Sequence, residues 1–404
     1  MAPMVLLGFA LVAGVAVWAG LTFTRLRNSQ SWLATVTPLA SIIGSGFLVC
    51  GPLLAREFGV LAAPAMAVLL AFAYAVGAVI RFNIAEAEPF LAKVHGQHPV
   101  AWIARGGQAM LAAAYAVSVA YYLKLLALFS LRPLGLDQEL PANILVTVIL
   151  ALLGVLSFTG GLRRVERVAE ASVSAKLGLI AAMLVALALA WSFLPSPLEP
   201  APPAHLRPYS LLLLLGLLIT VQGFETSRYM GESFDAPTRV RTMRRAQWIA
   251  AGIYMAFLIL LTPRMGEAAD TQGVAGVLDV MSAIVPALGG VVLAAAVASQ
   301  LSAAVADSIG STGIAVELSR RRLTLATGFL FAAALSVLVT WLTDAVAVIA
   351  VASRAFALYY AIQCAVAVGV ARAAGKATPP RIMGIVAVGI LCLVAAVAGA
   401  PAEG

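Results

Sequence analysis

Apolar runs of about twenty residues recur along this chain, and they constrain its fold more than any other feature. An α-helix rises about 1.5 Å per residue, so about 20 apolar residues cross the roughly 30 Å hydrocarbon layer of a bilayer. Of the 404 residues, 62% are hydrophobic and only 11% are charged, which leaves too little polar surface to cover a water-soluble core of this size. The sequence therefore predicts an all-α, polytopic membrane protein with a single membrane domain over residues 1–404.

The apolar runs predict about twelve membrane-spanning helices. They lie at residues 4–24, 32–55, 61–85, 103–131, 142–160, 171–194, 209–232, 246–264, 280–310, 323–342, 344–371 and 382–400.

Ten of these spans form a core that divides into two sets of five, at residues 32–194 and 209–371. Five crossings is an odd number, so the second set enters the membrane from the opposite face, which predicts an inverted repeat. The span at 4–24 is then an extra N-terminal helix, and the span at 382–400 is an extra C-terminal helix. The first span has no positive charge before it, unlike a signal peptide, so we expect it to be retained.

Positive charges alternate between the predicted loops. Eighteen of the 26 lysines and arginines fall on one side, in or near the loops that follow every second span, and four fall on the other. By the positive-inside rule the first side is cytoplasmic, which places both termini outside the cytoplasm. The net charge of +8 is scattered in short clusters rather than gathered on one face, so no nucleic-acid partner is expected. The expected location is the cytoplasmic membrane of a prokaryote.

Two spans are interrupted near their middles, in corresponding positions of the two sets. The first break is Ile43-Gly44-Ser45-Gly46, and the second is Gln222-Gly223-Phe224, which Glu225 follows directly. Unwound backbone inside a membrane survives where it lines a cavity, and its free amides and carbonyls suit the carboxylate and ammonium groups of a solute. The alternative is that these glycines only allow close helix packing. Paired breaks favour a small-molecule substrate site.

Several motifs resemble the amino acid, polyamine and organocation (APC) transporter superfamily. They are Ile42 to Phe47, Asn83 to Glu86, Gly223-Phe224-Glu225 with Glu232, and Asp235-Ala236-Pro237-Thr238-Arg239, in order over residues 32–371. The resemblance implies a five-plus-five inverted-repeat, LeuT-like fold, with a substrate site at the broken first and sixth core helices and alternating access. The extra N-terminal helix departs from the usual family pattern and indicates a divergent member.

Lys176 is the residue that bears on the identity of the coupling ion. An unpaired charge at membrane depth costs much free energy, so it indicates a functional site. In some proton-coupled or sodium-independent members of the family, a lysine of the fifth core helix occupies the place of a sodium ion, and Lys176 resembles that lysine. The alternative is that its side chain bends back to the headgroups. Asp307 lies at a similar depth on the eighth core helix and is a candidate partner. Its carboxylate and the hydroxyl of Ser302 are also groups that can bind sodium, so sodium stays an alternative to the proton as the coupling ion.

Other polar residues within spans carry weaker predictions. Glu225 resembles a family position linked to gating or protonation, the alternative being a pair with Arg228. Tyr115 is a candidate pocket residue, although an aromatic residue in a membrane helix often only packs. Arg354 is a candidate outer gate with Asp279, and Lys124 is expected to extend outward.

Three functional classes remain open. The first is a transporter of an amino acid or small organic amine, proton-coupled or exchanging. The second is a sodium-coupled symporter of another small solute, and the third is a membrane sensor that does not transport. No catalytic cluster, metal-ligand spacing or phosphate-binding loop is visible in the sequence, so neither an enzyme nor a cofactor is expected. The sequence does not predict the oligomeric state.

Overall fold

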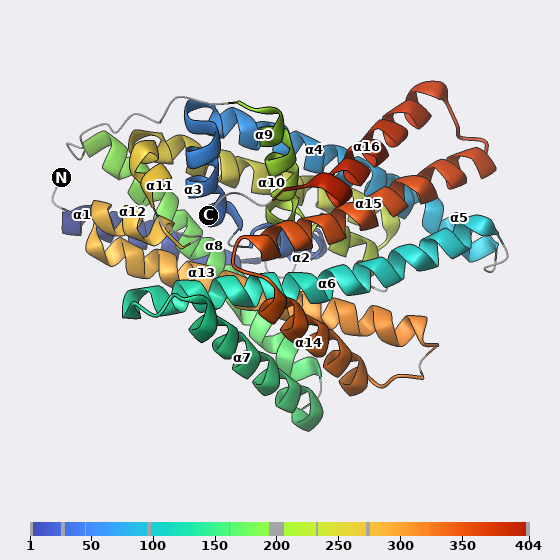
Figure 1. Ribbon diagram of the computed structural model, residues 1–404, viewed down its shortest axis with the longest axis horizontal. Helices are drawn as coiled ribbons and strands as arrows, with labels where there is room; N and C mark the ends of the chain where they lie inside the picture. The colour runs from blue at the N-terminus through green and yellow to red at the C-terminus, as the bar shows by residue number, and fades with distance from the viewer. Residues whose placement is uncertain are drawn as a thin grey trace.

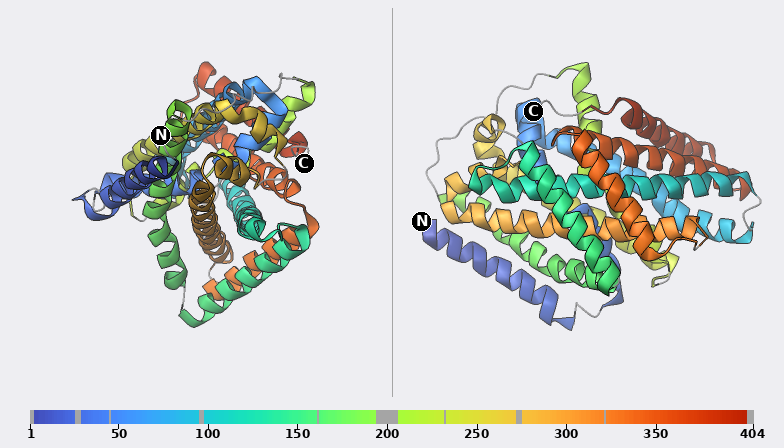
Figure 2. Two further views of the ribbon diagram at one scale, coloured as in Figure 1. Left: turned by 90° about the vertical axis from the view of Figure 1, so that its left-hand side faces the viewer. Right: turned by 60° about the horizontal axis from the view of Figure 1, so that its bottom comes forward.

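The computed structural model describes residues 3–25, 29–44, 46–94, 98–160, 162–193, 206–231, 233–271, 275–320 and 322–400. Every regular element within these ranges is a helix, and the longest helices run roughly along one axis of the molecule (Figures 1 and 2). Two residues of the predicted motifs, Ser45 and Glu232, lie outside the described residues.

The helices follow the predicted spans closely. Their bounds are α1 Pro3–Phe23, α2 Gln30–Ile42, α3 Gly46–Phe58, α4 Ala62–Phe82, a π-helix η3 Asn83–Ala87, α5 Glu88–Lys93, α6 Pro99–Leu131, α7 Glu139–Gly160, α8 Leu162–Phe193, α9 Pro208–Gly216, 3-10 helices η5 Leu218–Val221 and η6 Phe224–Met230, α10 Ala236–Leu261, α11 Met265–Asp270, α12 Val277–Ile284, α13 Pro286–Leu318, α14 Leu325–Leu342, α15 Ala347–Ala373 and α16 Pro379–Ala398.

Ten helical stretches among the described residues are long and apolar enough to cross a membrane. Neither predicted span 32–55 nor 209–232 forms one of these stretches by itself, because each is broken into short pieces; α3 is included only together with α4 and α5, in the stretch Gly46–Lys93. The predicted span 280–310 is also divided, since α12 ends at Ile284 and Pro286 begins α13. The described part of the chain is thus all-helical, and two of these three interruptions lie at the glycine motifs.

One group of helices consists of α6, α7, α8, α13 and α14, which pack on one another. The helices α6 and α13 run side by side through the middle of the molecule (Figure 1). Hydroxyl groups join this group across helices, because the Ser311 hydroxyl donates to the carbonyl of Ala112 at 2.8 Å and the Ser336 hydroxyl to that of Ala116 at 2.6 Å. Such bonds satisfy polar groups that the bilayer cannot hydrate.

A second group consists of α2, α3, α4 and α10 together with the short helix η6. The side-chain amide of Gln247 on α10 donates to the carbonyl of Ala73 on α4 at 3.0 Å. The rings of Phe47 and Phe257 meet edge to face with their centroids 5.3 Å apart, an arrangement favoured for aromatic pairs. The helix α15 contacts both groups, since it packs on α6 and on α4.

The extra helix α1 packs along α8, as Figure 2 shows at the edge of the molecule. A Cβ placed on Gly14 would lie 2.7 Å from the carbonyl oxygen of Gly178, and one on Gly178 would lie 2.8 Å from the carbonyl oxygen of Gly14. The two helices therefore touch backbone to backbone, as small residues allow in membranes. At the other end of the chain, α16 packs on α15.

Lys124 extends to the ends of two neighbouring helices, at the start of α7 and the end of α14, but it stays buried there. Its side chain is fully buried, and its ammonium group lies 2.7 Å from a carboxylate oxygen of Glu139 at the start of α7. The same ammonium group donates to the carbonyls of Thr340 and Thr343 at the end of α14. A cation at a helix C-terminus is favourable because the last carbonyls have no partner within the helix. Lys124 thus joins α6, α7 and α14.

Candidate functional site

The first break separates α2 from α3. Ile43 ends α2 with φ −83° and ψ 64°, outside helical values, and Gly44 follows before α3 begins at Gly46. All three residues are buried. The interruption confirms that the glycine motif breaks the helix, and it leaves carbonyl oxygens of the last turn of α2 free to bind groups outside the helix.

The second break separates α9 from η6. Gln222 is extended, with φ −86° and ψ 177°, and Gly223 has φ +119°. That left-handed conformation is open to glycine and costly for any residue with a Cβ. Phe224 then begins η6. Gly223 is therefore required by the backbone itself.

The two breaks lie directly against each other. A Cβ on Gly223 would lie 2.6 Å from the hydroxyl oxygen of Ser41, and a Cβ on Gly46 would lie 2.7 Å from the carbonyl oxygen of Thr220. The hydroxyl of Tyr254 donates to the carbonyl of Ile42 at 3.1 Å and also contacts that of Thr220. One tyrosine of α10 thus spans both discontinuities.

Lys176 reaches the first break from α8. Its ammonium nitrogen lies 2.7 Å from the carbonyl oxygen of Ala40 and 3.5 Å from the hydroxyl oxygen of Ser302. The side chain is fully buried, so it does not bend back to the headgroups. The ammonium group therefore lies among backbone and hydroxyl oxygens between α2 and α13.

Serine hydroxyls of α13 complete this oxygen-rich region. The Ser299 hydroxyl donates to the carbonyl of Ile43 at 3.1 Å, and the Ser302 hydroxyl donates to the carbonyl of Ser299 at 2.9 Å. The carbonyls of Ala40 and Ile43, with these two hydroxyls, are hard oxygen donors of the kind that bind a monovalent cation. In this structure the cation among them is the ammonium group of Lys176.

Asp307 and Glu225 lie apart from Lys176 in their bonding. Asp307 accepts a hydrogen bond from the Ser118 hydroxyl of α6, so the structure pairs it with Ser118 rather than with Lys176. Glu225 accepts bonds from the backbone amide of Gly223 at 3.0 Å and from the Tyr360 hydroxyl at 2.8 Å. Of the four predicted ion-coupling residues, Lys176 and Ser302 therefore contact each other, whereas Asp307 and Glu225 each bond to other residues.

Aromatic rings line the same region. The ring of Tyr115 meets that of Phe356 edge to face with centroids 5.7 Å apart, and Phe224 stacks on Tyr360 at 5.4 Å. These ring contacts join η6, which follows the second break, to α15, and α15 to α6.

Gln222 and Gly44 meet at Tyr122 of α6. The side-chain amide of Gln222 donates to the Tyr122 hydroxyl at 3.4 Å. A Cβ on Gly44 would lie 3.1 Å from the ring of Tyr122. Of the predicted substrate-binding residues, all except Ser45 are described and all of these are buried; six of them lie at the breaks, and Tyr115 lies on α6.

Sequence reasoning missed Ser118, the partner of Asp307. A signal was present, because Tyr115, Ser118 and Tyr122 recur at i, i+3 and i+7 along α6, which places three polar side chains on one face of a helix that is otherwise mainly apolar. The hydroxyl of Tyr254 was also missed, since a single tyrosine on α10 gives no such pattern.

The predicted motif Asp235 to Arg239 lies at the start of α10. Its Arg239 forms a clamp, a set of hydrogen bonds to Glu88 and to two carbonyls, at this arginine-rich end. Arg239 donates to both carboxylate oxygens of Glu88, at 3.0 and 2.6 Å, and to the carbonyls of Arg228 and Phe234. Asp235 caps α10 by accepting from the amide of Thr238, and the bonds from Thr238 lower the pKa of that carboxyl below its usual range. The start of α10 is thus tied to the chain just before it and to α5.

The predicted pair of Arg354 and Asp279 is wrong. Asp279 binds Arg132, whose Nε lies 3.2 Å from the carboxylate, and Arg132 also pairs with Asp137 at 2.9 Å. Arg354 instead donates to the carbonyl of Gly399 at 2.8 Å. The sequence places several charges near the same membrane face, but it does not show which of them form ion pairs.

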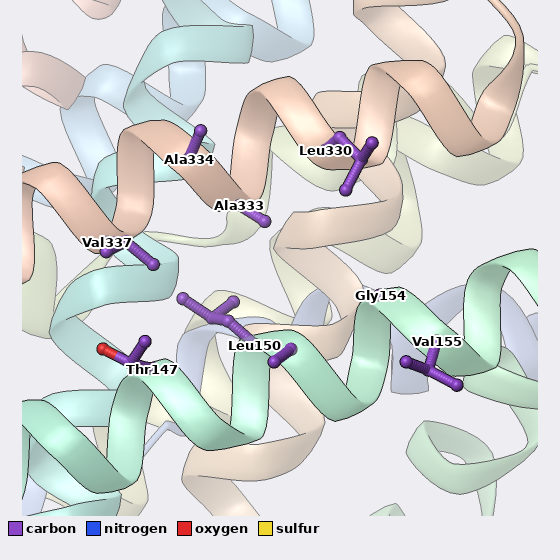
Figure 3. A pocket seen from close by; sticks show the side chains of 9 residues that line it. Thr147, Leu150, Gly154, Val155, Leu330, Ala333, Ala334 and Val337 are labelled. Atoms are coloured by element: carbon purple, nitrogen blue, oxygen red, sulfur yellow. The ribbon is translucent and has the colours of Figure 1, made fainter.

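A separate cavity of about 480 Å³ lies between α7 and α14 (Figure 3). Its lining is apolar apart from Thr147, and consists of Thr147, Leu150, Ala151, Gly154, Val155, Leu330, Ala333, Ala334 and Val337. It includes none of the predicted site residues, and its lining offers little to bind a polar solute. Among the described residues no group of three or more His, Cys, Asp or Glu side chains is placed to hold a metal ion.

Comparisons with known proteins agree with this geometry. An uncharacterised protein of Aquifex aeolicus (strain VF5) is 35% identical over 355 residues, covering 85% of this chain and 84% of that protein. A Na⁺-coupled sialic acid symporter, solved in a substrate-bound outward-open state, shares the fold with a TM-score of 0.53 at 15% identity, covering 99% of this chain and 97% of the symporter chain. A family model described as APC superfamily transporter matches residues 24–399. The chain is therefore a member of the APC superfamily of transporters.

Proposed function

We propose that this protein is a secondary active transporter that carries an amino acid or small organic amine across the cytoplasmic membrane by alternating access. The two sets of five helices act as inverted repeats, and the solute binds where their first helices are broken. The free carbonyls and amides at residues 43–46 and 222–224 supply the polar contacts.

Lys176 carries the coupling part of this proposal. Its ammonium nitrogen lies 2.7 Å from the Ala40 carbonyl and 3.5 Å from Ser302 at the first break. A positive charge held there occupies the oxygen donors that would otherwise bind a cation, so transport is driven by protons or by exchange rather than by sodium. Loss of the Lys176 proton would leave the Ala40 carbonyl without its charged partner and loosen α2 from α8, which couples protonation to movement of the broken helix.

Sodium coupling is the second candidate. The carbonyls of Ala40 and Ile43 and the hydroxyls of Ser299 and Ser302 form an oxygen set suited to sodium once the ammonium group leaves. The fold shared with a Na⁺-coupled symporter favours the same alternative.

The orientation follows from the charges. The helix ends and loops around Arg239, Arg320 and Arg372 lie on the cytoplasmic side under the positive-inside rule. The Arg239 clamp to Glu88 would then close the cytoplasmic end of the pathway.

The test is uptake into proteoliposomes that contain the purified full-length protein. Radiolabelled lysine, putrescine, glycine and glutamate are offered separately under an imposed inward proton gradient, an inward sodium gradient, or neither. The proposal expects accumulation of one of these solutes under the proton gradient or by exchange, with no requirement for sodium. Accumulation that depends on sodium would support the second candidate, and no uptake of any solute tested would count against transport of this class.

A further inference from the structure

The two residues that follow α16 lie against the half-helix that precedes the second break. The helix α16 ends at Ala398, beside α9 (Figure 1). The backbone amide of Ala400 donates to the carbonyl of Leu212 on α9 at 2.9 Å. Ala400 is only 6% exposed, so the chain is packed into the protein at this point.

A glycine at the end of α9 allows this close approach. A Cβ on Gly216 would collide with the carbonyl oxygen of Ala400 and would lie 2.9 Å from its carbonyl carbon. A Cβ on Gly399 would lie 3.5 Å from the Cα of Gly216. The backbones of α9 and of residues 399–400 therefore touch, and a side chain at position 216 would exclude the contact.

Arg354 of α15 holds the same two residues. Its Nε donates to the carbonyl of Gly399 at 2.8 Å. This carbonyl and the amide of Ala400 lie beyond the end of α16, where the helix offers them no partner. The bonds to Arg354 and Leu212 supply those partners, and they connect α15 to α9 through residues 399–400.

The residue before Arg354 makes a second connection to the same stretch. The Ser353 hydroxyl accepts a hydrogen bond from the backbone amide of Ile219, at 2.9 Å, in the short helix η5 that follows α9. The helix α15 is thus joined to the chain on both sides of Gly216, where α9 ends. The connection at Ile219 is direct, and the connection at Leu212 runs through residues 399–400.

These contacts bear on how the second broken span can move. The helix η6 leads into the arginine-rich start of α10, so α9 is the half of the span that lies toward the opposite membrane face. Alternating access requires the elements around a central site to move on one side of the membrane at a time. Leu213 of α9 is fully buried, so this half-helix is closed against its neighbours.

We propose that Gly399 and Ala400 form a strap that fastens α9 to α15, and that this strap must release before the solute pathway opens on the α9 side. The inference rests on the proposed function, to which it adds a closing contact on the face opposite the Arg239 clamp. The strap is separate from the coupling site, since Lys176 contacts the other broken span at Ala40.

The experiment measures how fast a thiol reagent labels a cysteine introduced at Leu213 in the purified full-length protein. The three native cysteines are buried, and protein without the introduced cysteine gives the background rate. Labelling needs α9 to open, so its rate reports the population of the opened form. A cysteine at Leu217, which is 1% exposed, is the second reporter if Leu213→Cys does not fold.

Arg354→Met removes the bond to Gly399. Loss of this charged hydrogen bond is expected to raise the labelling rate about tenfold or more. Gly216→Ala tests the strap from the α9 side, because its Cβ would displace Ala400, and a similar rise is expected. In a chain shortened to end at Ala398, labelling should already be fast. Gly216→Ala should add nothing further there, because the group that it displaces is gone.

Two matched variants control for the substitutions themselves. Gly384→Ala changes a glycine of α16 whose Cβ would meet nothing within 4 Å. Arg372→Met removes an exposed arginine from the last turn of α15. Both are expected to label as slowly as the protein that carries the introduced cysteine alone, and thermal melting of every variant shows that it is folded.

Each outcome decides the inference. Labelling that stays slow in folded Arg354→Met and in the shortened chain would overturn the strap, whether or not the protein transports. If Gly216→Ala speeds labelling equally in the full-length and shortened chains, the effect belongs to α9 alone and the strap is again overturned. Fast labelling in the strap variants, with no uptake of any solute by the wild type, would contradict the proposed function and leave the strap intact.

Discussion

The ammonium nitrogen of Lys176 on α8 lies 2.7 Å from the carbonyl oxygen of Ala40, in the last turn of α2 before the first break. A lysine at this position links the helix that carries it to the end of a broken helix through one charged hydrogen bond. Protonation of Lys176 and the position of α2 are therefore coupled in the account given above.

Lys176→Met is expected to abolish the pH dependence of uptake and to lower proton-driven uptake by about tenfold or more, since loss of a charged hydrogen bond is worth roughly 1.5–3 kcal/mol. In the wild type, uptake should rise as the pH on the side of solute entry falls. The measurement is the initial rate of uptake by proteoliposomes between about pH 5.5 and pH 8.5, a range that extends more than one pH unit to either side of neutrality.

Lys124→Met is the matched control, because Lys124 is also a fully buried lysine. It should lower the free energy of unfolding by about 1–3 kcal/mol, since the carbonyls of Thr340 and Thr343 lose their donor. The pH profile of uptake should keep its shape. A flattened profile in Lys124→Met would show that the effect of Lys176 is not specific to the first break.

Gly223→Val is expected to abolish uptake and to lower stability. The left-handed backbone alone costs a residue with a side chain about 1–3 kcal/mol, and the Cβ would also lie 2.6 Å from Ser41. Gly252→Val is the control, because a Cβ there meets nothing within 4 Å. Thermal melting and uptake, measured together, should show a large loss in the first variant and little change in the second.

The positions of the breaks were predictable from the sequence because glycine and polar residues interrupt an otherwise apolar pattern there. Lys176 was found for the same reason, since one charge within a long apolar run has few explanations. The partners were less accessible. Asp307 bonds to Ser118, which is 189 residues away in the chain. Such a pairing depends on how α6 and α13 are rotated about their axes, and the hydrophobic periodicity of the sequence does not fix that rotation closely enough.

The charges near the membrane faces show the same limit. Asp279 was expected to meet Arg354 and instead binds Arg132. Several arginines lie near that face, and the choice among them is set by how the helices pack, which the sequence pattern does not show. Lys124 is expected to extend outward, and its ammonium group does reach the ends of α7 and α14, where Glu139 and two carbonyls bind it without exposure to solvent.

Gly14→Leu is expected to separate α1 from α8. The Cβ would lie 2.7 Å from the carbonyl oxygen of Gly178, two residues beyond Lys176, so α8 must shift or α1 must detach. Uptake should fall, and its pH dependence should weaken, as expected when the contacts of Lys176 are lost. Gly20→Leu changes a glycine of the same helix with nothing within 4 Å of its Cβ, and it should behave as the wild type. Equal behaviour of the two variants would contradict a role for the α1 contact.

Arg239→Lys is expected to weaken the clamp at the arginine-rich end, because lysine cannot bind both oxygens of Glu88 at once. If the clamp closes the pathway, labelling of a cysteine introduced at Ser227, which is 1% exposed, should be faster in Arg239→Lys than with Arg239 present. Arg241→Lys is the control, because Arg241 is an exposed arginine two residues further along α10. Unchanged labelling in Arg239→Lys would show that the clamp only stabilises the start of α10.

The most direct test of the central claim is solute accumulation by proteoliposomes under a proton gradient, measured in parallel for the wild type and Lys176→Met with sodium absent. The account predicts concentrative, pH-dependent uptake by the wild type and loss of that dependence in the folded variant. Equal, pH-independent uptake by the two proteins, or uptake that appears only when sodium is added, would contradict it.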